Sequence, residues 1–463
     1  MGNTVDGLVS GMDTTTIIKS MMQIEAAPQT ALKAKVSTAQ TVVASYQSVN
    51  SRLAALKAAA TDLGQLSTWR AITPTSSSTG VTATAVGGTD TVAGAIKFDV
   101  KSLARSQAST MRVNTSYTVQ PAIPADPLVV GDKGTPAKTI FDDLNVPDTI
   151  SVQVGGAAAV SIDVSKDKSA KGIAAAINAA GLGVKASLVK VSETESMLQL
   201  NGTKSGLAST FTISDLENAS TDGFGLVNTT EASEALIRVG DPDNGHGGYE
   251  LRGDTNTFTG LMPGVTLTVS KEEDGVTVTT VPDVSGMAAK FQALVDAANA
   301  TLTEVATQTA YDPSTKIGSP LTGDFTVRQM GQSVLGSVSQ GQAGIGSLSK
   351  IGVELSKDGK QFTFNAQKFA DAYNADPDSI KTAGIQFGDT FRALAIKQVA
   401  NVTSSITGRN DVIGSMNLQI GNWDVRLVAK QLALSKTYSD LETALGKLKN
   451  QSTWLSGQIS SLS

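Results

Sequence analysis

The sequence contains no cysteine among its 463 residues, and charged residues make up only 17% and aromatic residues only 5%. The lack of cysteine excludes disulfides, thiolate metal sites and a cysteine nucleophile. Lys and Arg total 37 against 42 Asp and Glu, so the net charge of -5 provides no basic field for nucleic acid or an anionic membrane. Neither is therefore an expected partner.

Long apolar runs and cofactor motifs are also missing. No run reaches the roughly 18 apolar residues that a membrane-spanning helix needs. The sequence has no phosphate-binding G-x-x-x-x-G-K-[ST], no G-x-S-x-G and no G-x-G-x-x-G after a predicted strand, so we expect no cofactor and no enzyme. The segment Met1–Asp6 lacks the features of a secretory signal, which leaves a cytoplasmic protein or export by another route.

The single histidine, His246, lies in a Gly- and Asp-rich segment, 241–248, that could suggest a calcium loop. Such a loop needs oxygen ligands at its fifth position and a bidentate Glu at its twelfth. Gly245 and Arg252 stand at these positions, so we interpret the segment as an exposed turn and expect no metal.

Two groups of adjacent carboxylates, Asp142–Asp143 and Glu272–Asp274, could suggest a general acid/base pair. A catalytic pair requires an environment that separates the two pKa values, and no neighbouring apolar sequence would desolvate either group. We interpret both as solvated charge clusters. No catalytic residue is expected.

Both ends of the chain carry apolar residues at alternating steps of four and three. A 3.5-residue repeat places one narrow apolar stripe on a helix, which is unfavourable in water until it packs against another helix. We expect the two ends to pair as a coiled coil, although any helical bundle also shows apolar stripes. The predicted assembly residues are Val42, Tyr46, Val49, Leu53, Leu56, Leu63, Leu434, Tyr438, Leu441, Leu445, Leu448, Leu455 and Ile459.

Helical patterns at both ends enclose strand patterns in the middle. Asp13 predicts the N-cap of a short helix, and Pro28 separates it from a second helix over about 29–66. Strands alternate with turns from 71 to 283, including a ββαββ-like unit over 150–200. Helices then resume, with an Asp358–Gly359 hairpin between them and final helices over about 387–402 and from 421 to the end.

These patterns predict an α+β multidomain fold, in which both termini form a helical, coiled-coil stalk and a β-rich head is inserted between them. We expect four parts: a terminal coiled-coil leg (1–41 and 426–463), a helical stalk domain with a β-hairpin (42–70 and 284–425), a β-rich head domain (71–120 and 232–283) and a second head domain (121–231).

Several segments resemble one known family. The opening Gly7–Asp13, followed by a short helix and Glu25–Pro28, is similar to the start of the flagellar filament cap protein, also called hook-associated protein 2. Residues 149–188 resemble the flagellin hook IN motif, and the segments Leu321–Asp324 and Ser347–Val353 are similar to the family's C-terminal block. The resemblance covers nearly the whole chain.

The resemblance implies a structural protein without a cofactor, secreted and located outside the cell at the tip of the bacterial flagellum. Its expected partners are itself, in a ring-like homo-oligomer, flagellin, the flagellar type III export apparatus and an export chaperone. The ring would retain exported flagellin and promote its folding and insertion into the growing filament. The terminal helices would act as legs that reach into the filament end.

Two alternatives remain open. Another flagellar axial protein, either flagellin or a hook–filament junction protein, would share the helical termini and the IN motif. A surface adhesin would instead use the head, residues 71–283, to bind host glycan, since polar β domains on stalks suit both roles.

Overall fold

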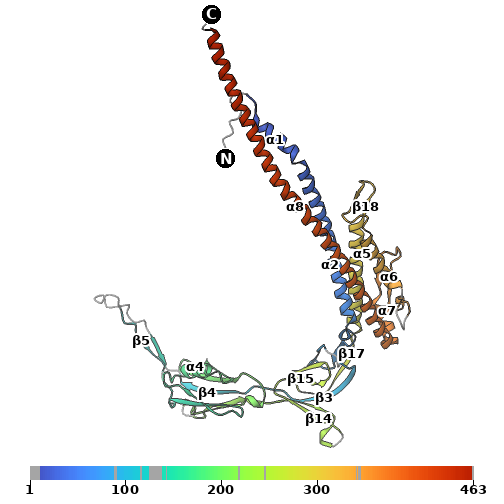
Figure 1. Ribbon diagram of the computed structural model, residues 1–463. Helices are drawn as coiled ribbons and strands as arrows, with labels where there is room; N and C mark the ends of the chain where they lie inside the picture. Colours follow the sequence, from blue (N-terminus) through green and yellow to red (C-terminus); the bar gives the residue numbers. More distant parts are fainter. Residues whose placement is uncertain are drawn as a thin grey trace. The chain divides into compact units, whose positions relative to one another are not determined.

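The computed structural model of the protein describes residues 11–87, 91–114, 117–124, 138–141, 143–216, 219–244, 247–339, 341 and 346–460. The chain forms two compact units, Met1–Trp69 with Val284–Ser463, and Arg70–Asp283. The first, the helical unit, contains both chain ends, and the second, the insertion, is rich in antiparallel strands (Figure 1). The predicted α+β multidomain class is confirmed, whereas the finer division into four parts stays a prediction.

The helical unit begins with α1 (Thr14–Glu25), α2 (Ala27–Gly64) and the short α3 (Leu66–Trp69). Asp13 caps α1 as expected, because its carboxylate accepts a hydrogen bond from the amide of Thr16 at 2.8 Å. Pro28 lies in the first turn of α2, where its missing N–H costs nothing.

The remaining elements of the helical unit follow the insertion. They are α5 (Val284–Thr309), β18 (Tyr311–Asp312), β19 (Ile317–Gly318), α6 (Phe325–Ser339), η4 (Leu348–Ile351), β20 (Val353–Leu355), β21 (Phe362–Phe364), α7 (Ala366–Ala375) and α8 (Pro377–Ser460). The predicted hairpin is present: β20 pairs with β21, and Gly359 provides the positive φ of 67° in the turn.

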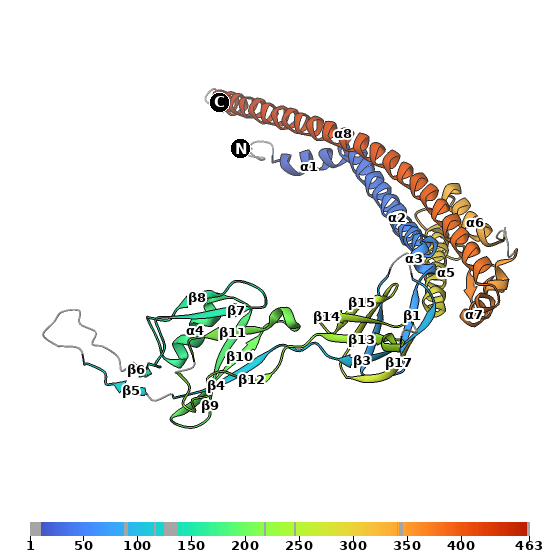
Figure 2. The same cartoon turned by 90° about the horizontal axis from the view of Figure 1, so that it is seen from below.

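The C-terminal helix differs from the prediction. Two separate helices were expected, but α8 is one continuous helix of 84 residues, about 125 Å long (Figure 2). Gly408, Gly414 and Gly421 interrupt the apolar pattern there, but glycine costs a helix only about 1 kcal/mol each, and no proline is present to break it. The helix therefore continues through the expected gap.

One hydrophobic core joins α2, α5, α6, α7 and the first part of α8. Aromatic rings lie at its centre: the ring of Phe291 is 4.9 Å from that of Phe369, and Phe387 is 4.8 Å from Phe391. Trp69 closes one end of this core and donates its indole N–H to the carbonyl of Leu63 at 2.7 Å. Rings packed at such distances add to the burial energy.

The insertion contains two sheets around its first core. β1 (Ile72–Ser76), β17 (Glu273–Pro282), β3 (Gly94–Ser102), β13 (Ala235–Val239) and β14 (Tyr249–Gly253) form a five-stranded sheet in that order. β15 (Thr257–Met262), β16 (Val265–Val269) and β2 (Val81–Ala85) form a second sheet. The first and last strands of the insertion pair directly, with Ile72 opposite Pro282.

The second core of the insertion lies under α4 (Ala170–Ala180). One sheet has the order β12 (Val227–Thr230), β4 (Ala108–Asn114), β10 (Glu195–Gly202) and β9 (Val184–Lys190), and the other β11 (Phe211–Ser214), β7 (Thr149–Val154) and β8 (Val160–Asp163). The hairpin β5 (Tyr117–Gln120) and β6 (Lys138–Phe141) is separate. The predicted ββαββ order is therefore correct.

Candidate assembly surface

The predicted apolar stripe of α2 lies inside the helical unit. Tyr46, Val49, Leu53, Leu56 and Leu63 are buried, and Val42 is partly buried. The sequence analysis expected their partners at the other end of the chain, from Leu434 to Ile459. Instead they share a core with α5 and the first part of α8, where Phe387, Phe391, Ala395 and Val402 are buried.

Two contacts define how α2 and α8 run beside each other. Near one end, Gly388 lies against Gly64 and Ala60. Near the other, Gln29 donates its side-chain amide to the carbonyl of Ile420 at 3.3 Å and to the carboxylate of Asp424. The two helices are therefore antiparallel and in contact over almost the full length of α2 (Figure 2). This fixes the register of α8 up to Asp424.

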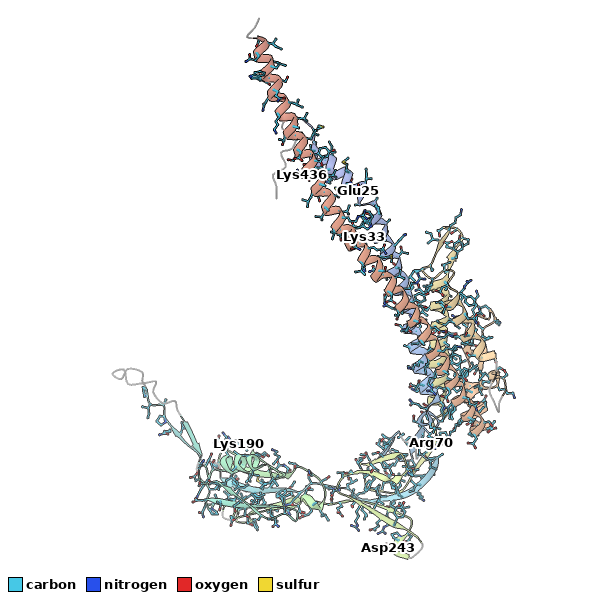
Figure 3. All side chains as sticks on the ribbon, viewed as in Figure 1. Glu25, Lys33, Arg70, Lys190, Asp243 and Lys436 are labelled. Carbon is cyan, nitrogen blue, oxygen red and sulfur yellow. The ribbon has the colours of Figure 1, made fainter. Side chains whose placement is uncertain are left out.

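Beyond that point α1 lies along α8. Glu25 forms an ion pair with Lys430 at 3.2 Å, and the hydroxyl of Tyr438 lies 3.9 Å from the sulfur of Met21. Figure 3 shows Glu25 and Lys436 on this part of the unit, and both residues belong to the predicted leg, 1–41 and 426–463. Because Glu25 and Lys430 are about half exposed, their pair adds little stability.

The predicted stripe at the end of α8 is largely uncovered. Leu434, Tyr438 and Leu445 are partly buried, but Leu441 is 40%, Leu448 60%, Leu455 54% and Ile459 61% exposed. Met21, in the second half of α1, lies beside Tyr438, and the rest of α1 back to Thr14 spans only about 10 Å. Ile459 lies about 31 Å beyond Tyr438 along α8, so α1 does not reach it. The apolar stripe of α8 is therefore partly covered where α1 lies along it, and it is exposed beyond the end of α1.

A second exposed stripe on α8 was missed by the sequence analysis. Leu418 is 74%, Val425 72%, Val428 58% and Leu432 67% exposed. At 100° per residue these side chains lie on nearly the opposite face of α8 from Leu427 and Leu434. We call them the outer stripe. The steps of seven from 418 to 425 to 432 could have revealed it, because they repeat the heptad period in a second register.

Polar contacts hold α2 against the rest of the helical unit. The buried hydroxyl of Tyr46 donates to the carboxylate of Asp324, whose other oxygen accepts the amide of Val327 at 3.0 Å and caps α6. Burial and the adjacent Asp324 raise the pKa of Tyr46, so the phenol remains a donor.

A second polar contact joins α2 to α5. Ser48 donates to Glu304 at 2.7 Å, and this bond and one from Gln308 lower the pKa of Glu304.

The predicted carboxylate cluster Glu272–Asp274 lies at the surface of the insertion and forms ion pairs with basic side chains. Asp274 pairs with Lys101 at 2.7 Å, and Glu272 pairs with Arg105 at 3.2 Å.

His246 and Asp142, named in the sequence analysis, lie outside the described residues. Within the described ranges, no group of three or more His, Asp or Glu side chains could hold a metal ion. No helix among the described residues is long and apolar enough to cross a membrane.

These features define a class of protein. Both chain ends build one helical unit, exposed heptad stripes follow its longest helix, and the chain between them forms an insertion rich in antiparallel strands. Large exposed apolar stripes mark surfaces for other helices. The fold and the surface together are those of a structural assembly protein.

Comparison with known families identifies the family of assembly proteins to which the chain belongs. A model described as the N-terminus of flagellar hook-associated protein 2 matches residues 10–107, and the model of its C-terminus matches residues 243–450. Together they match about two thirds of the chain. The flagellin hook IN motif matches residues 149–204. The chain belongs to the flagellar hook-associated protein 2 family.

Individual relatives agree with this family. The chain is 28% identical over 287 residues to the lateral flagellar hook-associated protein 2 of Vibrio parahaemolyticus, covering 59% of this chain and 62% of that protein. It is 24% identical over 319 residues to the flagellar hook-associated protein 2 of Salmonella typhimurium, covering 64% and 68%. The matched region thus spans about two thirds of each relative.

A solved structure shows that the fold is shared. The crystal structure of the D1-D2-D3 domains of the flagellar cap protein FliD from Escherichia coli aligns with a TM-score of 0.57 at 20% identity. The alignment covers 79% of this chain and 99% of that one. The arrangement of helices and strands described above therefore has an experimental counterpart.

Proposed function

We propose that this protein caps the distal tip of the flagellar filament outside the cell. It forms a ring-like homo-oligomer that retains exported flagellin and promotes its folding and insertion into the growing filament. Family membership and the fold shared with a flagellar cap protein support this proposal. The observation that carries it is the exposed apolar stripe from Leu441 to Ile459, a surface that requires another helix.

The stripe suggests how the leg works. A narrow heptad stripe exchanges one helical partner for another with a small difference in free energy, because the same few apolar contacts form each time. Leu448, Leu455 and Ile459 are already exposed, so they can contact a filament helix without first leaving a partner in the described chain. The leg then holds the filament end while the ring moves as subunits are added.

The route to the tip follows from the same proposal. The chain travels through the flagellar type III export apparatus largely unfolded, kept unfolded beforehand by an export chaperone. A cysteine-free chain suits this route, because it refolds outside the cell without forming disulfides. A cap without disulfides gains its stability from hydrophobic cores and from assembly.

Negative-stain electron microscopy of the purified protein, alone and with flagellin and short filament seeds, tests the proposal. We expect a small closed ring that seats on one end of the seeds. Open filaments of this protein alone would instead identify another axial protein, and monomers that ignore the seeds would favour an adhesin.

A double substitution tests whether filament growth depends on the apolar stripe from Leu441 to Ile459. The double substitution Leu445→Asp and Leu448→Asp should abolish filament growth while the insertion remains folded, as shown by circular dichroism. Lys447→Asp, between them on another face of α8, is the matched control and should sustain growth. Normal filaments with the double variant would contradict the role of the stripe.

A further inference from the structure

A groove in the insertion lies between two sheet edges. β11 is the last strand of the order β11-β7-β8, and β12 is the last strand of β12-β4-β10-β9. Residues of both strands line one cavity of about 570 Å³, with Ile213 on one side and Val227 on the other. An unpaired strand edge exposes backbone N–H and C=O groups that can pair with another chain.

At one position on the β11 edge, a side-chain amide forms the hydrogen bonds that the backbone of a neighbouring strand would form. The side-chain amide of Gln107 donates to the carbonyl of Phe211 at 2.8 Å and accepts from the amide of Phe211 at 2.9 Å. Gln107 is buried, and its two hydrogen bonds to Phe211 are those that a residue of a neighbouring strand would make. The β11 edge therefore accepts an amide group in strand register.

Among the described residues, the next position on that edge whose backbone groups have no hydrogen-bond partner is Ile213. Gly155 donates its amide to the carbonyl of Thr210 at 2.6 Å, so Thr210 and every second residue after it turn their backbone groups toward β7. Phe211 and Ile213 lie between these positions and turn theirs outward. The outward N–H and C=O of Ile213 thus point toward the groove, about 6.6 Å beyond the pair that Gln107 occupies.

The walls of the groove specify the side chains of an occupant. Phe224 is 79% exposed at the groove, held between Gly223 and Gly225, whose φ values of 77° and 67° suit glycine. The exposed carboxylate of Glu231 lines the same groove and accepts a hydrogen bond from the side-chain amide of Asn228 at 3.2 Å. The groove therefore combines an apolar wall with negative charge.

We propose that this groove binds an extended peptide segment of a partner protein as an additional strand on β11. Its backbone pairs with Ile213, an apolar side chain packs on Phe224 and Val227, and a Lys or Arg lies beside Glu231. This is strand addition to an exposed sheet edge, in which backbone bonds provide affinity and side chains provide specificity. The charge complementarity favours a basic segment over an acidic one.

The probe is a fluorescein-labelled heptapeptide in which Val alternates with Lys and Thr, titrated against the full-length protein by fluorescence anisotropy. We expect saturable binding and slower hydrogen exchange of the amides in residues 211–214. Phe224→Ala and Glu231→Lys, both at exposed positions, should each weaken binding at least about tenfold, as expected for lost apolar contact and reversed charge.

Two controls make the result specific. Val160→Ala changes an exposed residue on β8, the other edge of the same sheet, and should bind the peptide as the unchanged protein does. A peptide with proline at alternate positions lacks the backbone donors and should not bind. The proposal is overturned by no binding, by equal binding of the proline peptide, or by weakening in Val160→Ala. Protection of residues 211–214 that rises with protein concentration in the absence of peptide would also overturn it, because a second copy would then be the occupant.

Discussion

Gly388 of α8 lies so close to Gly64 of α2 that a Cβ atom added to Gly388 would be 2.7 Å from the Gly64 nitrogen. The same Cβ would lie 2.8 Å from the carbonyl oxygen of Ala60. One turn earlier, Gly384 packs against the ring of Trp69. Backbone atoms cannot move aside as a flexible side chain can, so α2 and α8 must separate if Gly388 acquires a side chain.

Gly388→Ala should therefore destabilise the helical unit by about 1–3 kcal/mol, the usual cost of inserting a methyl group into a well-packed core. Gly414→Ala is the matched control, because a Cβ there meets no atom within 4 Å and alanine favours the helix by up to about 1 kcal/mol. Thermal unfolding followed by circular dichroism at 222 nm compares the two. Equal melting temperatures would show that α2 and α8 do not approach so closely.

Tyr46→Phe should lower the free energy of unfolding by about 1–3 kcal/mol, because the carboxylate of Asp324 loses a buried donor. Tyr438→Phe provides the comparison and should change stability little, because its hydroxyl on the leg makes one weak hydrogen bond within the described residues, to the sulfur of Met21 at 3.9 Å. Urea unfolding monitored by tryptophan fluorescence measures both. A loss in Tyr438→Phe as large as in Tyr46→Phe would contradict the assignment.

The turn between β18 and β19 should respond to acid. Hydrogen bonds from Ser314 and Thr315 lower the pKa of Asp312 from 3.8 to about 2. Because the folded pKa is lowered, the stabilisation from Asp312 is complete above its unfolded pKa and is lost as the pH falls through about 2. Titration of the carboxyl carbon by NMR should show a midpoint near 2. A midpoint at the ordinary value would show that these hydrogen bonds do not form in solution.

Substitutions in the outer stripe should separate stability from assembly. Val425→Asp and Leu432→Asp change exposed side chains, so we expect the free energy of unfolding to change by less than about 0.5 kcal/mol. If the outer stripe contacts another helix in the proposed cap, filament elongation on seeds should fall severalfold, whereas Gln419→Asp, at an exposed position on another face of α8, should have no effect. Unchanged elongation would leave the stripe without a role in assembly.

Local sequence signals predicted local structure well. Asp13 defined the start of α1, and Asp358–Gly359 defined the β20–β21 turn, because capping and turn geometry depend on a few adjacent residues. The resemblance to the cap family, now supported by family models, also came from short segments in order.

Predictions that depended on distant residues were less successful. The heptad pattern identified the stripe of α2 but not its partner, because any apolar stripe can pair with any other. The close contact of Gly388 with Gly64 joins residues far apart in the chain, and a glycine in a helix carries no sign of what lies beside it. Likewise, the groove beside Ile213 exists only because two sheets end next to each other.

The pairing of Ile72 with Pro282 makes the insertion an exchangeable module. Opposed residues of antiparallel strands have Cα atoms only about 4.5–5.5 Å apart, so the chain leaves and re-enters at nearly the same point. A Gly-Ser linker of a few residues could then replace everything between Trp69 and Val284, and the helical unit could fold around it. Evolution can in the same way lengthen, shorten or replace this middle portion without altering the helices that flank it, and the junction offers a natural site for grafting foreign domains.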